Sequence, residues 1–278
     1  MQRSVELLAE NQSFTEGKLL TGGARDAGGR VSRRRKKMQE TFAVIALIGR
    51  PAAGKSEVID YLKKESVERR KKRFRIGAFE EIDDFPFVWE TFEIDDILSK
   101  HGRERLFTTP DYYFKDPFVW NLFIERISLE FAKRLARDPN YLKDTTAIVE
   151  FARGGPNGFR EAFSFLSDEI LKRAGVVYIN VSYEESCRKN RRRCDPKKAD
   201  SILFHSLPDE KMEFYYKTND WDEMATGNDG YLTIRGHTVP FSVFNNEPEV
   251  TDKPEELGIA LEGVFGRLWK RMQEKPRE

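Results

Sequence analysis

Cysteine and histidine are scarce in this chain, which has 2 of the former and 3 of the latter among 278 residues. Two cysteines cannot build the disulfide framework of a secreted domain, so the sequence favours a reducing, cytoplasmic compartment. Long apolar runs are absent too: the longest, Phe42 to Ile48, is far shorter than the roughly 20 residues of a membrane-spanning helix. The sequence therefore predicts no membrane association.

An excess of either charge is also missing, because 48 Lys and Arg stand against 47 Asp and Glu. The net charge of +1 points to no particular partner for the chain as a whole. What the chain does have is a hydrophobic content of 39%, with 21 Phe and 4 Trp, which is enough for a sizeable core. Disorder over most of the length is therefore excluded.

Residues 1–40 differ in composition from the rest, because a glycine-rich stretch at 21–29 precedes a cluster of arginines and lysines within 30–37. We expect a flexible basic N-terminal extension with little surface to bury. A basic run can bind the phosphates of a nucleic acid, but the pattern favours a solvated arm over that contact.

From residue 41 onward, short apolar runs alternate with stretches of helical periodicity. Runs that are apolar throughout are typical of strands buried on both faces of a parallel sheet. The sequence therefore predicts an α/β domain with five parallel strands and helices on both faces, and a hairpin around Gly236 that leads into the fifth strand. The expected strands cover 42–48, 74–82, 146–151, 176–181 and 239–244, and the clearest helices cover 120–135 and 257–272.

The strongest chemical signal follows the first expected strand, where the chain reads GRPAAGKS and matches the pattern G-x-x-x-x-G-K-[ST]. In such a loop, glycines let successive backbone N–H groups face phosphate oxygens, and the N-terminus of the next helix favours negative charge. Lys55 would reach the β- and γ-phosphates of ATP, and the Ser56 hydroxyl would ligate Mg²⁺. The expected nucleotide contacts are Gly49, Ala52, Ala53, Gly54, Lys55 and Ser56.

The GTPase signature N-K-x-D and the transporter signature L-S-G-G-Q do not occur in the chain. Residues 41–274 instead resemble the P-loop kinase family, which contains nucleoside, nucleotide and small-metabolite kinases. The phosphate-loop motif is the specific match, and the other elements agree in position and chemistry. The resemblance implies a doubly wound, five-stranded parallel sheet of P-loop kinase type, with a helical acceptor-binding insertion at about 85–145 and an arginine-bearing lid at about 183–230.

The resemblance also implies an acidic residue at the end of the second strand, where Asp83 and Asp84 stand. Adjacent side chains at a strand end point to opposite sides. One carboxylate could therefore accept the proton of the acceptor hydroxyl or organise Mg²⁺, while the other caps the helix that starts at Phe85. We favour Asp83 as the acting group, and the alternative is that both residues are helix caps.

Glu150 and Arg153 end the third strand, in a segment that resembles the D-G-F-P-R segment of nucleotide kinases with Glu in place of Asp and no Pro. Because α/β proteins bind ligands at the carboxyl ends of their strands, Glu150 is a candidate ligand of Mg²⁺. The alternative for Glu150 is a buried structural hydrogen bond. Arg153 could hold an anionic acceptor.

The segment after the fourth strand resembles the lid of these kinases, in which Arg188, Arg191 and Arg192 are the candidates for closing over the phosphates. On a helix two or three of them could converge, and a solvated basic face is the alternative. Asn245, at the end of the fifth strand, belongs to a segment that resembles the lining of the adenine site.

These features predict an enzyme that transfers the γ-phosphoryl group of Mg-ATP to a small-molecule acceptor, such as a nucleoside, a nucleotide or a similar metabolite. One alternative is an NTP hydrolase or switch whose output is conformational. Another is a nucleic-acid end-processing kinase that uses the basic run at 30–37. The oligomeric state is left open by the sequence.

Overall fold

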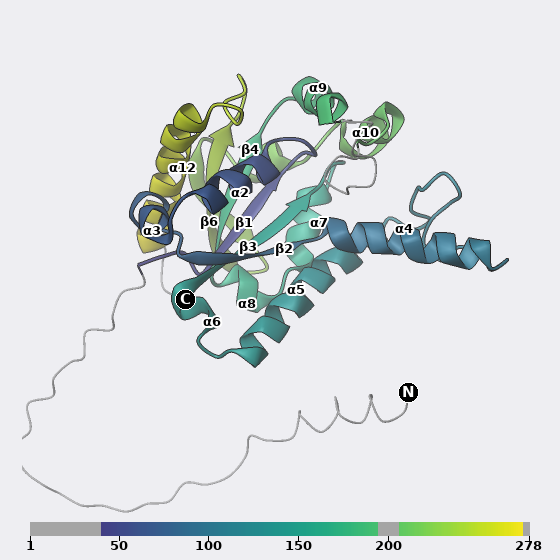
Figure 1. Cartoon of the computed structure of the whole chain (residues 1–278), viewed down its shortest axis with the longest axis horizontal. Coiled ribbons are helices and arrows are strands. Elements are labelled where there is room, and N and C mark those ends of the chain that lie inside the picture. The colour runs from purple at the N-terminus through teal and green to yellow at the C-terminus, as the bar shows by residue number, and fades with distance from the viewer. Residues whose placement is uncertain (1–39, 194–205, 275–278) are drawn as a thin grey trace, which may run out of the picture. The chain divides into compact units, whose positions relative to one another are not determined.

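The protein contains a mixed sheet of six strands in the order β2-β3-β1-β4-β6-β5 (Figure 1). The computed structural model describes residues 40–193 and 206–274. The expected extension at 1–40, including the basic run at 30–37, therefore lies outside the described residues apart from Glu40. The strands are β1 (Val44–Gly49), β2 (Ala78–Asp83), β3 (Thr145–Ala152), β4 (Ala174–Asn180), β5 (Asp229–Ile234) and β6 (His237–Asn245).

Five strands run parallel, with β1 paired to both β3 and β4 at the centre of the sheet. The expectation of a purely parallel, five-stranded sheet is wrong in one respect, because β5 joins the edge as a sixth strand antiparallel to β6. The predicted hairpin is the reason. Arg235 and Gly236 form its turn with φ values of 46° and 84°, and this left-handed geometry suits a tight hairpin that folds β5 onto β6.

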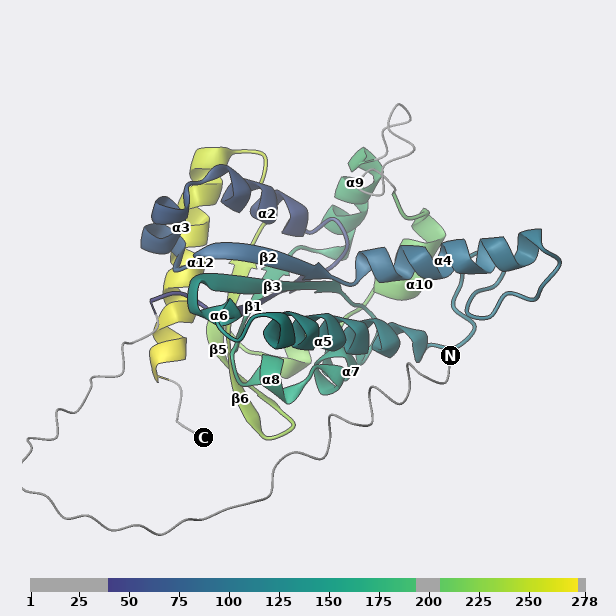
Figure 2. The same ribbon diagram turned by 60° about the horizontal axis from the view of Figure 1, so that its bottom comes forward.

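Side chains of β1 alternate between two cores, as they must in a strand covered on both faces. Val44, Ala46 and Ile48 pack into the core on one face, and Ile45 and Leu47 pack into the core on the other. The helices lie correspondingly on both faces of the sheet (Figures 1 and 2). The face of Ile45 is covered by α2 (Lys55–Lys64), α3 (Val67–Phe74) and α12 (Pro254–Glu274), and the face of Val44 by α5 (Val119–Arg137), α7 (Gly158–Phe165) and α8 (Asp168–Leu171).

The remaining helices are distributed around this core. Helix α4 extends away from the carboxyl end of β2, and α9 and α10 lie near the carboxyl ends of β1 and β4 (Figures 1 and 2). Their bounds are α4 Phe85–Lys100, α6 Tyr141–Asp144, α9 Tyr183–Arg193, α10 Asp209–Tyr216 and α11 Trp221–Met224. None of the helices among the described residues is long and apolar enough to cross a membrane.

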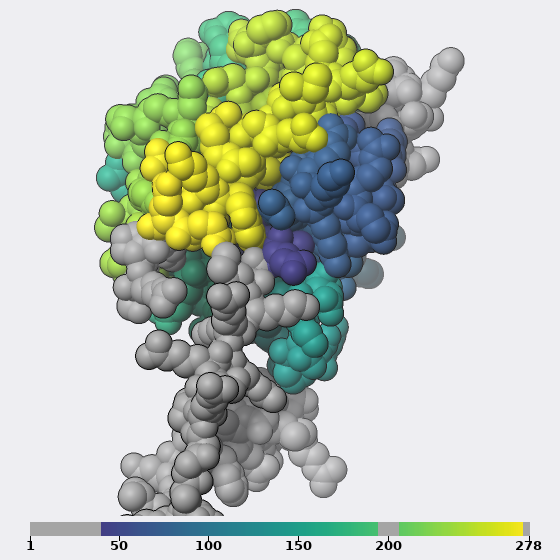
Figure 3. Space-filling view, turned by 90° about the vertical axis from the view of Figure 1, so that its left-hand side faces the viewer, coloured from purple at the N-terminus to yellow at the C-terminus, as the bar shows by residue number. Residues whose placement is uncertain are grey.

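The second strand begins later than the sequence predicts. Phe74 ends α3 instead of starting a strand, and its ring packs edge-on against Tyr61 and Phe265 beneath α12. Arg75 has a φ of 59° and donates its backbone N–H to the carbonyl of Arg70, which closes the helix. Figure 3 shows this side of the molecule, where α12 lies beside α3. The helical predictions at 120–135 and 257–272 are confirmed by α5 and α12.

The start of α7 is fixed by a residue distant in the chain. Asp220 is fully buried, and its carboxylate accepts hydrogen bonds from the backbone N–H groups of Phe159 and Arg160, each at 2.9 Å. We predict that Asp220→Ala lowers the free energy of unfolding by about 2 kcal/mol, because two N–H groups lose a buried partner. Denaturant unfolding would measure the change. The exposed Asp222→Ala is the control and should change stability by less than about 0.5 kcal/mol, and equal stability of the two variants would contradict the assignment.

Candidate functional site

The loop between β1 and α2 has a backbone that few side chains would tolerate. Ala52 has a φ of 54° and Gly54 a φ of 120°, so both residues have left-handed backbone conformations. A Cβ atom on Gly54 would lie 2.7 Å from the Asn246 amide nitrogen, and one on Gly49 would lie 2.8 Å from the carbonyl oxygen of Ile179. Both glycines of the motif are therefore required by the geometry of the loop.

Side chains from distant elements hold this loop by its carbonyl oxygens. The Asn246 amide donates to the carbonyl of Ala53 at 2.8 Å, and the ammonium of Lys189 lies 3.4 Å from the same oxygen. Ser186 donates to the carbonyl of Pro51 at 2.7 Å. The N-cap residue of α2 is Gly54, which has no side chain to cap the helix, so the N–H groups of Lys55 and Ser56 are available to a ligand.

A cavity of about 430 Å³ opens beside this loop, at the carboxyl ends of the strands. The loop and the start of α2 line one end through Pro51, Ala52, Lys55 and Ser56. The other walls come from the ends of β2 and β3, from α4 and the segment after it, from the start of α5, and from α9 and α10 with the residues just before it. The cavity volume is within the usual range for small-molecule sites.

Two carboxylates end neighbouring strands on the loop side of this cavity. Asp83 of β2 is the register partner of Glu150 of β3, and the ammonium of Lys55 lies 4.0 Å from a Glu150 oxygen. Lys55 also donates to the carbonyl of Arg50 at 3.2 Å. The structure therefore brings the predicted Lys55, Asp83 and Glu150 together, with Ser56 in the same cavity.

Burial decides the protonation of these acids. Loss of hydration raises the pKa of Asp83 to about 7 and the charge of Asp84 adds to the rise, against the hydrogen bond from Phe85 and the charge of Lys55. Loss of hydration likewise raises the pKa of Glu150 to about 8, partly offset by Lys55. One ammonium is therefore too little to keep both carboxylates charged at neutral pH.

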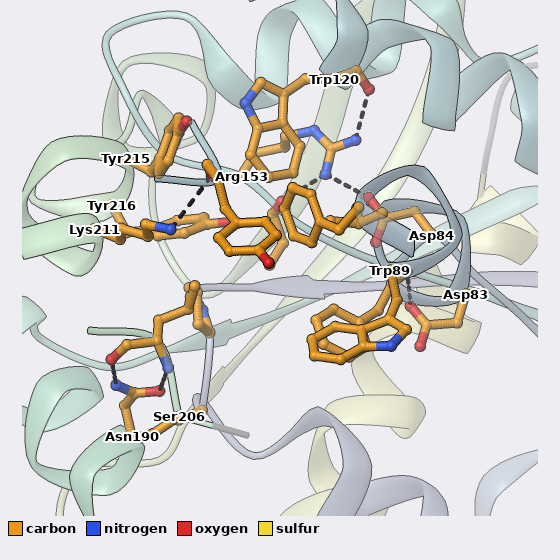
Figure 4. Close-up of a pocket in the computed structure, with 18 of the residues that line it drawn as sticks. Asp83, Asp84, Trp89, Trp120, Arg153, Asn190, Ser206, Lys211, Tyr215 and Tyr216 are labelled. Atoms are coloured by element: carbon orange, nitrogen blue, oxygen red, sulfur yellow. Dashed lines mark hydrogen bonds and ion pairs between the residues drawn. The ribbon is translucent and has the colours of Figure 1, made fainter. Parts of the chain in front are cut away.

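Asp84 points to the other side of the strand, as expected for adjacent residues. Its carboxylate accepts a hydrogen bond of 2.5 Å from Arg153, whose guanidinium also donates to the carbonyls of Ala152 and Trp120 (Figure 4). The helix cap falls to Asp83, which accepts the backbone N–H of Phe85 at 3.1 Å. Asp83 thus both faces the cavity and caps α4, and Asp84 does not cap it.

The predicted lid arginines are not brought to the cavity. Arg188 and Arg192 form ion pairs with Glu249, Arg191 forms one with Asp209, and none of the three lines the cavity. The residues of α9 that do line it are Asn190 and Arg193. Asn190 exchanges two hydrogen bonds with the backbone of Leu207, and Arg193 pairs with Glu57 at 3.0 Å.

Of the two asparagines after β6, the structure connects the second to the loop. Asn245 is exposed and hydrogen-bonds to Asn180 and Asn228, away from the cavity lining. Asn246 is fully buried and holds Ala53. The sequence placed both asparagines in one segment and named Asn245 as the candidate contact, whereas the fully buried Asn246 is the one that reaches the loop.

Aromatic side chains form the far wall, and sequence reasoning named few of them. Trp89 and Phe92 lie on α4, three residues apart, with Glu93 and Asp96 continuing the same helical face. Phe114 belongs to the following segment, Trp120 to α5, and Tyr215 to α10 together with Lys211. Helical spacing on α4 and α10 was the available signal.

The segment after α4 is anchored to that helix by one carboxylate. Asp95 is fully buried and accepts hydrogen bonds from the backbone N–H groups of Leu106, Phe107 and Thr108, and from the Thr108 hydroxyl at 2.6 Å. Burial works against ionisation, but these donors prevail and lower the pKa of Asp95. The aromatic wall is therefore built on a fixed segment.

No protein-family model matches the chain, and no curated protein matches it either. Among solved structures, the crystal structure of APE1195 is 14% identical, covering 81% of this chain and 98% of that one, with a TM-score of 0.38. The crystal structure of TT1252 from Thermus thermophilus is 12% identical, covering 86% of this chain and 100% of that one, with a TM-score of 0.36.

The raised pKa values of Asp83 and Glu150 predict how stability depends on pH. The native protein keeps protons that the unfolded chain has lost, so the free energy of unfolding without ligands should fall as pH rises from about 4 to about 8. Glu150→Gln removes one of these groups and should flatten the fall. Urea unfolding across this pH range measures the slope, with the exposed Glu125→Gln as the control. An unchanged slope in Glu150→Gln would contradict the protonation of Glu150.

Proposed function

We propose that this protein is an ATP-dependent phosphotransferase of the P-loop kinase type, which transfers the γ-phosphoryl group of Mg-ATP to a small-molecule acceptor such as a nucleoside, a nucleotide or a similar metabolite. One observation carries the proposal. The Gly49–Ser56 loop, the acids that end β2 and β3, and an aromatic wall all line the same cavity of about 430 Å³. Phosphoryl transfer needs these three kinds of contact in one place.

The phosphate end of the site rests on the loop and α2. The N-terminus of α2 has no side-chain cap among the described residues, and Lys55 projects beside it into the cavity. Backbone N–H groups at a helix start and a lysine ammonium bind phosphate oxygens, so the residues present fit a nucleoside triphosphate. Arg193 is the arginine of α9 that would face such a ligand, in place of Arg188, Arg191 and Arg192.

Ser56 and Glu150 are the residues that would hold Mg²⁺. In the described part of the chain, no group of three or more acidic, histidine or cysteine side chains is placed to hold a metal on its own. Magnesium usually takes one or two protein carboxylates and completes its shell with water and substrate phosphates. When bound, ATP would supply the transferable phosphoryl group, and Mg²⁺ would neutralise negative charge on it.

Asp83 is the residue best placed to accept the proton of the acceptor hydroxyl. It lines the cavity as the register partner of Glu150, and its pKa near 7 suits a general base at neutral pH. Asp84 is already bound to Arg153, so it keeps that guanidinium in place.

The strand order also supports the P-loop kinase type. β1 has β3 on one side and β4 on the other, and the loop follows β1 at that central position. In open α/β sheets, ligands bind at the carboxyl ends of the strands where the strand order changes direction.

Replacement of the loop lysine tests the proposal. We predict that Lys55→Ala lowers acceptor-dependent ATP consumption by about 100-fold or more, because one positioned cation on the transferred phosphoryl group is lost. ADP release would be measured with and without a pool of nucleosides, nucleotides and sugar-like metabolites. Lys64→Ala is the matched control, since Lys64 is an exposed lysine of the same helix.

Three outcomes are informative. Equal rates for Lys55→Ala and Lys64→Ala would refute the assigned role of the loop. Turnover that ignores every added acceptor would identify an NTP hydrolase instead. Consumption that rises only with an acceptor would support the transferase.

A further inference from the structure

The far end of the cavity is a continuous wall of aromatic rings drawn from four parts of the chain. Ring centroids lie 6.4 Å apart for Trp89 and Phe92, 5.5 Å for Phe92 and Phe114, 4.9 Å for Phe114 and Trp120, and 5.5 Å for Trp120 and Tyr215. All five rings line the cavity. Such a wall favours contact with a planar, weakly polar ring.

The arginines at this cavity are already committed to carboxylates. Arg153 is bound to Asp84 at 2.5 Å and Arg193 to Glu57 at 3.0 Å, and these are the two arginines among the described lining residues. The Arg153 Nε atom has no acceptor among the described residues, which leaves a single buried N–H and not a fork. Recognition of a phosphate monoester normally uses the fork of a free guanidinium.

At the aromatic end, the cavity lining contains one lysine, Lys211, and two acidic residues, Glu93 and Asp96. Lys211 donates to the backbone carbonyl of Tyr112 at 3.3 Å and forms no ion pair with a described residue. Glu93 and Asp96 line the same cavity, and Asp96 already binds Arg105 at 2.6 Å. Burial lowers the pKa of Lys211 against the charges of Glu210 and Asp111, and its ammonium lies over the rings of Tyr112 and Tyr113, at 5.4 and 5.0 Å from their centroids. Lys211 is therefore the one cation without an ion pair at this end of the described lining, and Glu93 and Asp96 beside it disfavour the two negative charges of a phosphate group.

We infer that the acceptor is an uncharged compound with an aromatic or heteroaromatic ring and a free hydroxyl group, as in a nucleoside, and not the phosphorylated form of such a compound. This inference rests on the proposed transferase function and narrows its acceptor. The ring lies against the wall of Trp89, Phe92 and Phe114. The hydroxyl faces Asp83, which takes its proton as the oxygen forms the new bond to phosphorus and ADP leaves.

Matched pairs of acceptors test this inference on the wild-type protein. Phosphoryl transfer from γ-labelled ATP would be measured for adenosine, guanosine, cytidine, uridine and thymidine, each beside its 5′-monophosphate. At least one nucleoside should be phosphorylated about 10-fold faster, as kcat/KM, than its own monophosphate, which equals about 1.4 kcal/mol. A monophosphate that is phosphorylated as well as its nucleoside, or better, overturns the inference and leaves the transferase function standing.

Binding measured by calorimetry separates the two failures if no transfer is seen. Nucleosides should bind, and D-ribose, which lacks an aromatic ring, should not. Binding of Mg-ATP without binding of any nucleoside overturns the inference alone. Binding of a nucleoside without binding of Mg-ATP supports the ring site and refutes the proposed function.

A ring-removing variant locates the contact. Trp89→Ala should weaken nucleoside binding about 10-fold or more, because stacking on an aromatic side chain is lost. Phe118→Ala is the matched control, since Phe118 is an exposed aromatic residue outside the cavity lining and packs on Phe165. Thermal unfolding would establish that both variants are folded. Equal affinity of folded Trp89→Ala and wild type would overturn the placement of the ring.

Discussion

The carbonyl oxygen of Ala53 is the contact on which the site depends. It accepts a hydrogen bond from Asn246, 193 residues further along the chain, and lies beside Lys189, 136 residues away. These two contacts hold the Ala53 carbonyl, and they thereby fix the conformation of the next residue, Gly54. Gly54 must then adopt a φ of 120°, and the Asn246 amide leaves no room for a Cβ atom. Glycine at position 54 therefore permits both the left-handed turn and the close approach of Asn246 to the loop. Lys55 follows it at the edge of the cavity.

The hold of Lys189 on the loop also bears on why Arg188 and Arg192 of α9 face away from the cavity. Glu249 forms ion pairs with Lys189, Arg188 and Arg192 at 2.9 to 3.1 Å. Burial opposes the charge of Glu249, but the hydrogen bonds and charges of these cations lower its pKa to about 2. Residues 188 and 192 share one helical face, and the cavity lies beside another that carries Asn190 and Arg193. The face of α9 that was expected to cover the phosphates is therefore occupied by ion pairs with Glu249.

Local patterns were predictable from the sequence, and features that depend on distant partners were not. β1, the loop and α2 form one contiguous signal, so their order and the place of Lys55 at the start of α2 were foreseen, as was the place of Glu150 near the end of β3. Phe74 was misassigned because a buried apolar residue before a strand resembles the strand itself. The hairpin around Gly236 was predicted, but its first arm was not counted as a strand of the sheet, because periodicity does not report pairing at a sheet edge. The insertion at about 85–145 was expected to bind the acceptor, but the assembly of its rings with Tyr215 of α10 into one wall depends on packing between separate elements.

Because neighbouring side chains of a strand point to opposite sides, the charged residues near the ends of β2 and β3 form two separate groups. On one side Asp84 and Arg153 form an ion pair at 2.5 Å and both line the cavity, although burial raises the pKa of Asp84 against the charge of Arg153. On the other side Asp83 and Glu150 share Lys55, which leaves one more carboxylate than ammonium. Because Lys55 alone does not balance both carboxylates, loss of hydration raises the pKa of Asp83 to about 7 and that of Glu150 to about 8. Under the proposed function, a divalent cation would supply the missing charge, so its binding and the release of a proton would be coupled at this end of the cavity.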